Sequence, residues 1–372
     1  MLSIKDFFKK YPNMIAVIKL AIFLYFFFLS LEMMGDSLKL FGKDFSESLI
    51  ATTTNPLVGL FIGILATSII QSSSSTTTIV VGMVAGGAFS TNPEVSISLA
   101  IPIIMCANIG TSVTNIIASL PQINRSNEFR KAFASAVVHD FFNVLSVLVL
   151  LPLQIATNFL GILSTQMAEI FAGVGGLKFL SPIKAITKPL ATMIEPYFKD
   201  IPWLMFLIAL LLLFIALKYM VSSLKVIVVS RAKDWFDRYL FKTALRAFFV
   251  GIVLTMLVQS SSITTSLVVP MAGAGLLTLE QIFPYTLGSN IGTTITAILA
   301  ALITGNIAAV TVAFALTLFN FCGIILWWPL KIVPITIAKK FAEYSIRSKI
   351  IPIAFVLVIF FIIPLLVIYL LN

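Results

Sequence analysis

The chain has 372 residues, of which 59% are hydrophobic and only 11% are charged, and its mean hydropathy is +1.07. Soluble domains carry about 25% charged residues, so a soluble enzyme is excluded. The long apolar runs instead predict an all-α polytopic protein of the cell membrane, embedded in the lipid bilayer. The net charge of +10 is attributed to cytoplasmic loops, so nucleic acid is not expected as a partner.

Seven apolar segments are long enough to cross a bilayer, which takes about 20 residues. They lie at residues 14–34, 95–120, 132–156, 202–229, 280–304, 306–330 and 350–371. Two further apolar regions, 56–90 and 244–278, are interrupted near their middles by hydroxyl-rich runs. Because these interruptions are too polar for plain spans, each region is predicted to enter the membrane and turn back as a re-entrant helical hairpin.

The distribution of Lys and Arg predicts the orientation. With the N-terminus in the cytoplasm, four segments with 16 Lys and Arg lie inside: residues 1–13, 121–131, 230–246 and 331–349. The outer segments 35–55 and 157–201 hold six. Basic residues are enriched in cytoplasmic loops, so this orientation is favoured, and it places the C-terminus outside.

The two interrupted regions are copies of each other at a constant offset of 188 residues. The first copy contains Gly63, Thr67, Gln71, Ser72, Ser73, Ser74, Thr76 and Thr77, and the second contains Gly251, Thr255, Gln259, Ser260, Ser261, Ser262, Thr264 and Thr265. Further on, Asn108-Ile109-Gly110-Thr111 recurs as Asn290-Ile291-Gly292-Thr293, and Phe142-Asn143 recurs as Phe319-Asn320. One repeat is therefore a hairpin, a broken span and a span.

Three full spans separate the starts of the two hairpins, so the second repeat must enter from the opposite face. Inverted repeats with interrupted helices are typical of secondary transporters, whose site lies between the repeats near the midplane. The chain is accordingly divided into five parts: an N-terminal span and outer loop (1–54), repeat 1 (55–156), a linker with a span and a basic segment (157–242), repeat 2 (243–330), and a basic loop with a last span (331–372).

Each hairpin carries a glutamine followed by hydroxyl residues, within stretches 48–93 and 247–279 that contain no charged residue. Lipid offers such groups no partners. A single membrane serine usually bonds to its own helix, but two matching copies favour a ligand site. Two hairpin tips bring helix N-termini, backbone N–H groups and hydroxyls together, which suits an oxyanion.

The Asn and Thr residues around Gly110 and Gly292 predict cation sites. Glycine at the centre of a span permits unwinding, and the freed carbonyls with Asn and Thr oxygens suit a small cation such as sodium. Neither repeat core contains Lys or Arg, so co-bound cations must balance the charge of the anion. The residues therefore predict cation-coupled anion symport.

These motifs resemble the type II sodium–phosphate cotransporters. The resemblance covers residues 55–155 and 243–330, and it rests on the paired Gln-Ser-Ser-Ser motifs, Ile101–Met105, Asn108–Asn115, Phe129–Phe133, Val138-His139-Asp140 with Asn143, and Leu150–Leu153. It implies import of inorganic phosphate, expected as HPO4 2−, coupled to co-transported sodium. The implied phosphate ligands are Ser73, Ser74, Ser75, Ser260, Ser261 and Ser262. The implied sodium ligands are Gln71, Asn108, Thr111, Ser112, Asp140, Gln259, Asn290, Thr293 and Thr294, and one hydroxyl can serve both sets.

Asp140 is the only acidic residue well inside a core span, which makes it a functional candidate. The structural alternative is an ion pair with the adjacent His139, the only histidine. In the family, an Ala-x-Ala-x-x-x-Asp pattern accompanies electrogenic transport. Ala134, Ala136 and Asp140 match that pattern, and the resemblance therefore implies electrogenic transport with a sodium ion at Asp140.

Three other functions are compatible with parts of the sequence. A sodium-coupled transporter of another oxyanion would use the same site. An intramembrane serine hydrolase would need a motif serine with His139 as its base, but the chain has no G-x-S-x-G motif. An anion channel could be lined by serines but has no need of paired cation sites.

Overall fold

The computed structural model describes residues 12–41, 55–173, 181–216 and 241–371, together with Tyr219 and Ser223. Every regular element in this part of the chain is helical, and no strand occurs there. Six described helical segments are long and apolar enough to cross a membrane: Met14–Leu38, Pro93–Gln122, Ser126–Thr157, Leu279–Thr304, Ile307–Trp327 and Ile350–Leu371. They confirm the all-α fold class and correspond to six of the seven expected spans.

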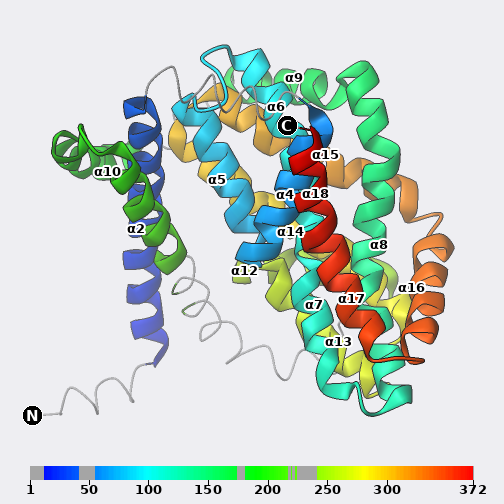
Figure 1. Ribbon diagram of the computed structural model, residues 1–372. Coiled ribbons are helices and arrows are strands. Elements are labelled where there is room, and N and C mark those ends of the chain that lie inside the picture. The colour runs from blue at the N-terminus through cyan, green and yellow to red at the C-terminus, as the bar shows by residue number, and fades with distance from the viewer. Residues whose placement is uncertain are drawn as a thin grey trace, which may run out of the picture.

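The seventh expected span, 202–229, is seen as an apolar helix over Pro202–Ala216. Most of its remaining residues, and most of the basic segment 230–246, lie outside the described part of the chain. The linker before it contains α9 (Phe159–Gly173), α10 (Ser181–Ile194) and the short helix η3 (Glu195–Phe198). Helix α2 (Pro12–Leu40) packs against α10 and α5 on the left of Figure 1.

Both interrupted regions fold as two helices joined by a two-residue turn. In the first, α4 (Pro56–Ile70) and α5 (Ser73–Gly86) are joined by Gln71-Ser72. In the second, α12 (Ala244–Val258) and α13 (Ser261–Gly273) are joined by Gln259-Ser260. The predicted interruptions therefore fall at the helix–helix turns, and re-entry into a membrane stays a prediction.

The two repeats run in opposite directions. After the first hairpin follow α6 (Pro93–Gly110), α7 (Ser112–Ser119), η1 (Leu120–Gln122) and α8 (Ser126–Thr157); after the second follow α14 (Leu279–Thr304) and α15 (Ile307–Trp327). The α5–α6 connection lies at the upper end of Figure 1, whereas α13 lies at the lower end. The chain closes with α16 (Ile332–Ser345), α17 (Ile350–Leu357), η4 (Val358–Ile362) and α18 (Ile363–Leu371).

The expected unwinding at the two span centres is wrong for the second repeat. Helix α14 runs without a break through Gly292, and the first repeat breaks only at Thr111, between α6 and α7. The glycines serve close packing instead. A Cβ on Gly292 would lie 2.6 Å from Thr255 Cβ and 2.8 Å from Ile252 O of α12, and Gly110 is equally crowded by α4. Small residues allow membrane helices to approach this closely.

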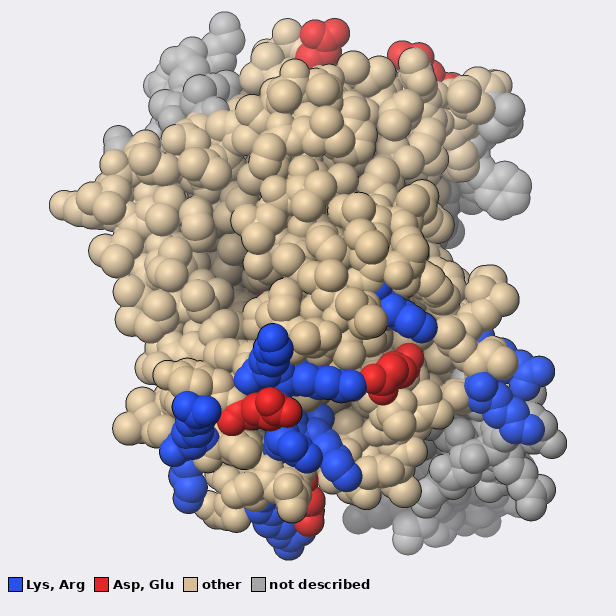
Figure 2. Space-filling view, turned by 90° about the vertical axis from the view of Figure 1, so that its right-hand side faces the viewer, with Lys and Arg blue, Asp and Glu red and all other residues tan. Residues whose placement is uncertain are grey.

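Two of the predicted cytoplasmic segments meet at one end of the molecule. Arg130 Nη1 lies 4.0 Å from Glu343 Oε1, and Lys349 Nζ donates to Asn124 Oδ1 at 2.6 Å. Figure 2 shows Lys and Arg gathered in the lower part of the face that carries α8 and α16, with most of the face above them uncharged. Segments 121–131 and 331–349 therefore lie on the same side, as the predicted orientation requires.

We expect Gly292→Ala to destabilise the folded protein. Alanine favours a helix over glycine by roughly 0.5–1 kcal/mol, so a glycine without a packing role would give a more stable variant. Because the new methyl group would meet α12, overpacking should outweigh this gain and cost about 1–3 kcal/mol net. Thermal unfolding in detergent measures the change. Gly173→Ala is the matched control, since no atom lies within 4 Å of the Cβ position there; a rise in melting temperature for Gly292→Ala would contradict the packing role.

Candidate substrate and ion site

The tips of the two hairpins meet in the interior of the protein. Ser73, the first residue of α5, and Ser261, the first residue of α13, are buried with their hydroxyl oxygens 3.5 Å apart. Ser262 Oγ donates to the backbone carbonyl of Gln71 at 3.2 Å. Residues that are 188 positions apart in the sequence thus form one polar contact, with the N-terminus of a helix on each side.

The local sequence dictates the same turn in both copies. Gln71 and Gln259 adopt left-handed backbone conformations, with φ of 56° and 52°, and each backbone N–H donates to a carbonyl one turn back at 2.6 Å. The following serine caps the next helix: Ser72 Oγ accepts from Ser75 N at 3.2 Å, and Ser260 Oγ accepts from Ile263 N at 3.4 Å. Serine is a preferred N-cap residue, so the glutamine ends one helix and the serine starts the next.

A hydroxyl pair ties the two arms of each hairpin together behind the tip. Thr67 Oγ1 donates to Thr76 Oγ1 at 3.0 Å in the first hairpin, and Thr255 and Thr264 are joined at 2.8 Å in the second. All four threonines are buried. The two hairpins therefore have equivalent hydrogen bonds behind their tips.

A chain of buried amide side chains crosses between the repeats beside the tips. Asn108 Nδ2 donates to Asn320 Oδ1 at 3.0 Å, and Asn290 Nδ2 donates to Asn143 Oδ1 at 2.7 Å. These two bonds are equivalents, because Asn108 corresponds to Asn290 and Asn143 to Asn320 in the repeat. Asn143 Nδ2 also donates to Asn108 O at 3.4 Å, which connects the two pairs. The amides thus bind the first full span of each repeat to the last span of the other repeat.

His139 extends this chain and breaks its symmetry. Its Nε2 lies 2.6 Å from Asn290 Oδ1, and it is fully buried. Because Asn290 Nδ2 already donates to Asn143, its oxygen is the acceptor and His139 Nε2 the donor. The expected alternatives for His139, an ion pair with Asp140 and a catalytic pair with a serine, are thus replaced by an amide contact in the described part of the chain. The second repeat has Leu316 at the equivalent position.

Several buried oxygens near the α6–α7 break have no protein partner among the described residues: Thr111 Oγ1, Ser112 Oγ, Thr114 Oγ1 and Asp140 Oδ1. Ser112 lies close to the Asp140 carboxylate. Buried polar atoms are nearly always satisfied in folded proteins, so these orphaned oxygens, with Ser112 beside the Asp140 carboxylate, make this region a candidate site for an ion or a water molecule. Hydroxyls and a carboxylate are the hard oxygen ligands suited to a small cation.

The remaining predicted ligands divide into three groups. Ser74 and Ser75 are buried at the start of α5, and Ser74 Oγ has no partner within the described residues. Gln71 is exposed and Gln259 is partly exposed, so the turns place them at the edge of the site. Thr293 and Thr294 donate to carbonyls of their own helix at 3.0 and 2.8 Å, the ordinary arrangement of a membrane threonine.

Sequence reasoning assigned no role to Asn143 and Asn320, although both belong to the repeat. Their recurrence at a fixed offset was a signal that each faces the repeat boundary. Sequence reasoning also assigned no role to Asn115, whose Oδ1 accepts from Thr265 Oγ1 of the second hairpin at 2.9 Å. Nothing in the repeat pointed to this contact, because Ala297 stands at the equivalent position.

An inverted pair of repeats whose interrupted helices meet at buried polar tips is the architecture of a secondary transporter. The sequence matches the family described as Na+/Pi-cotransporter over residues 26–179 and 212–326. The chain therefore belongs to the Na+/Pi-cotransporter family.

Its relatives include sodium-dependent phosphate transport protein 2B of Homo sapiens, 34% identical over 92% of this chain and 63% of the relative. This chain is also 33% identical to sodium-dependent phosphate transport protein 2A of Mus musculus, over 96% of this chain and 67% of the relative. The chain thus spans slightly less than two thirds of the 2B protein's length. No solved structure shows a significant match.

We expect the side chains of Asn143 and Asn290 to be energetically coupled. Truncating either to alanine leaves the partner unsatisfied at a cost of about 1–3 kcal/mol, and truncating both should cost less than the sum by 0.5 kcal/mol or more. A double-mutant cycle on thermal unfolding in detergent measures this coupling. Asn143 with Thr317 is the control pair, because Thr317 donates to its own helix at Ala313 O. Strict additivity for Asn143 and Asn290 would rule out the bridge.

Proposed function

We propose that this protein imports inorganic phosphate together with sodium, and that phosphate binds between the two serine tips. The observation that carries the proposal is the meeting of Ser73 and Ser261 at the N-termini of two helices from opposite repeats. Membership of the Na+/Pi-cotransporter family and relatives named sodium-dependent phosphate transport proteins support the same substrate pair.

The tips offer the chemistry that a phosphate requires. Each helix N-terminus has free backbone N–H groups and a partial positive charge, a common arrangement for binding phosphate. Hydroxyl donors stand at the same place on both sides, and neither α5 nor α13 contains a charged residue. Because hydroxyls and the Gln71 carbonyl also accept hydrogen bonds, the site suits an anion that still carries a proton, which favours HPO4 2−.

The tip contact is weak enough for a substrate to replace. The hydroxyl oxygens of Ser73 and Ser261 are 3.5 Å apart, and the bond from Ser262 to Gln71 O is 3.2 Å long. In each hairpin the first helix packs most on its own repeat, α4 on α6 and α12 on α14, whereas the second helix, which carries the tip serine, packs most on the other repeat, α5 on α14 and α13 on α8. A phosphate bound between the tips would replace the two tip bonds with several charge-assisted ones.

We place one sodium ion at Asp140, with Ser112 and Thr111 as neighbouring ligands. Two further sodium ions beside the amide chain would neutralise the phosphate dianion, so the ion at Asp140 leaves one positive charge to move inward. Thr317 stands at the position of Asp140 in the second repeat and bonds to its own helix. Only one repeat therefore supplies a carboxylate, and transport should be electrogenic, gaining about 2.3 kcal/mol per 100 mV of membrane potential.

Removing the paired serine hydroxyls should abolish most transport. The double variant Ser73→Ala/Ser261→Ala loses two donors to a charged ligand, each contributing about 1.5–3 kcal/mol, so uptake at low phosphate should fall at least tenfold. The measurement is uptake of labelled phosphate into proteoliposomes under an inward sodium gradient, with potassium in place of sodium as the blank. Ser98→Ala is the matched control, because Ser98 is exposed and bonds to its own helix. Unchanged uptake by the double variant would move the substrate site elsewhere, and competition by sulfate would favour another oxyanion.

Asp140→Gly should retain sodium-dependent phosphate uptake and lose the transport current, because the uncompensated charge no longer moves. Current and labelled uptake are measured on the same proteoliposomes at a fixed membrane potential. Thr317→Ala serves as the control at the equivalent position of the other repeat and should keep both signals. A current that persists in Asp140→Gly in proportion to uptake would refute the role of Asp140.

A further inference from the structure

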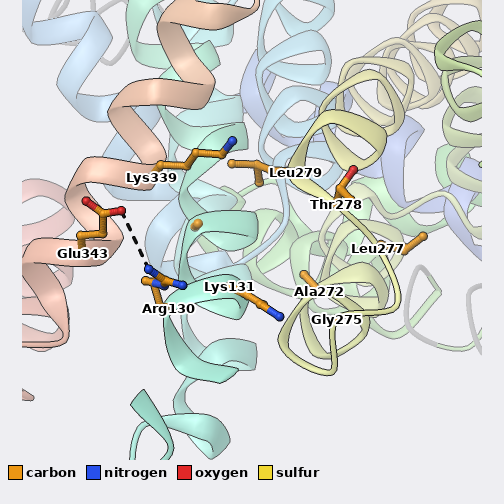
Figure 3. Close-up of a pocket in the computed structure, with 10 residues that line it drawn as sticks. Arg130, Lys131, Ala272, Gly275, Leu277, Thr278, Leu279, Lys339 and Glu343 are labelled. Atoms are coloured by element: carbon orange, nitrogen blue, oxygen red, sulfur yellow. Dashed lines mark ion pairs between the residues drawn. The ribbon is translucent and has the colours of Figure 1, made fainter. Parts of the chain in front are cut away.

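A second polar feature lies at the basic end of the molecule, away from the serine tips. A cavity of about 350 Å³ opens between α8, the α13–α14 connection and α16 (Figure 3). This volume is at the lower end of the range for small-ligand pockets, roughly 300–1,000 Å³. Three cations line it, Arg130, Lys131 and Lys339, against a single carboxylate, Glu343.

Lys131 is the cation in this lining without a counter-ion. Arg130 faces Glu343 at 4.0 Å, and Lys339 Nζ lies 2.7 Å from a carboxylate oxygen of Glu280. Lys131 makes no ion pair within the described part of the chain. Figure 3 shows its side chain extending from α8 toward Gly275, and a Cβ on Gly275 would lie 3.2 Å from its ammonium. The absence of a side chain at residue 275 leaves room beside this charge.

Lys131 is not required to complete the end of α13. The backbone N–H groups of residues 274–276 already donate to the last carbonyls of that helix, at 2.9 Å each. On the neighbouring wall, Thr278 and Leu279 mark the start of α14, a helix of 26 residues. The first turn of α14 already carries Glu280, and Gln281 Oε1 accepts from Thr278 N at 2.9 Å in a capping box, so the charge in the lining that no ion pair among the described residues neutralises is that of Lys131.

The cavity is lined in part by two helices that also carry residues of the proposed transport site. Its walls include Ala134 of α8 and Ala272 of α13. The same two helices carry Asp140 and Ser261 at the repeat boundary. Each side chain in the two ion pairs at the rim of the cavity is about half exposed. Such exposed pairs contribute only about 0–1 kcal/mol to the stability of the fold. An incoming anion could therefore rearrange them at little cost.

We infer that this cavity binds a phosphate group at the cytoplasmic end of the protein, with Lys131 as the principal ligand and Arg130 and Lys339 beside it. The group can come from inorganic phosphate or from the headgroup of an anionic lipid, since basic pockets between membrane helices bind such headgroups. The inference concerns a site distinct from the serine tips, and its binding test does not depend on the proposed transport function.

The test measures binding with the proposed transport site removed, in the full chain carrying Ser73→Ala/Ser261→Ala. One arm measures equilibrium binding of labelled inorganic phosphate without sodium, in nanodiscs of phosphatidylcholine alone. The other arm extracts the protein from vesicles of phosphatidylcholine and phosphatidylglycerol and counts retained phosphatidylglycerol by native mass spectrometry. Lys131→Gln is compared with Lys340→Gln, which removes the same charge from an exposed position on α16 outside the cavity.

Lys131→Gln should weaken binding about tenfold in one of the two arms, as expected for loss of a charge-assisted hydrogen bond. Lys340→Gln should leave that arm unchanged, and Lys131→Arg should restore part of the loss. The affected arm identifies free phosphate or lipid as the source of the group. Equal behaviour of Lys131→Gln and Lys340→Gln in both arms, with unchanged thermal stability, would overturn the inference. Failure of sodium-dependent uptake by the wild-type protein would overturn the proposed transport function and leave this result standing.

Discussion

Hydroxyl and amide groups inside a membrane protein must find their hydrogen-bond partners within the protein, because hydrocarbon supplies none. In this chain the side chains of Asn108, Asn143, Asn290 and Asn320 find them across the boundary between the two repeats. Asn108 bonds to Asn320, and Asn290 bonds to Asn143, so that the first full span of each repeat is bound to the last span of the other. The hairpins lie against the same two spans that these asparagine bonds hold in place, because α4 packs on α6 and α12 packs on α14.

Within this symmetric frame, the residues that break the symmetry coincide with the proposed ion chemistry. His139 and Asp140 stand in the first repeat where the second has Leu316 and Thr317. A strictly symmetric pair of repeats would bind ions in pairs on its two sides. A single carboxylate on one side provides a site for one additional, unpaired cation, and the proposed net movement of charge requires such a cation. In the proposed mechanism, the duplicated residues form the substrate site, and Asp140, which has no counterpart in the second repeat, holds the sodium ion whose charge the phosphate does not balance.

Glycine has a different role from the one its position in the sequence suggests. Gly110 and Gly292 follow the repeated asparagines and invite a reading as points of unwinding. The space around them shows close packing instead, with helix α14 continuous through Gly292. From the sequence alone, a glycine in a polar motif at a span centre is compatible with both unwinding and close packing, since both require the absence of a side chain. Only the neighbouring helix distinguishes them.

The sequence by itself determined the class of the fold, the positions of six spans, the two interrupted hairpins and the residues that form their tips. These follow from local physics: apolar length, a run of hydroxyls that cannot continue a plain span, and a duplication visible as a constant offset. It also predicted Asn108, Asn290 and Asp140 as sodium ligands; all three are buried, and their binding of sodium stays a prediction.

Only the tertiary structure decided which of these groups meet. The partner of His139 is Asn290, 151 positions away, and the partner of Thr265 is Asn115, 150 positions away. Periodicity in the sequence does not predict which residues so far apart along the chain meet. A hydrogen bond between two helices depends on their rotation and separation, and packing sets both. For the same reason only the structure distinguishes Thr293 and Thr294, which bond to their own helix, from Thr111 and Ser112, whose hydroxyl oxygens are buried without a hydrogen-bond partner among the described residues.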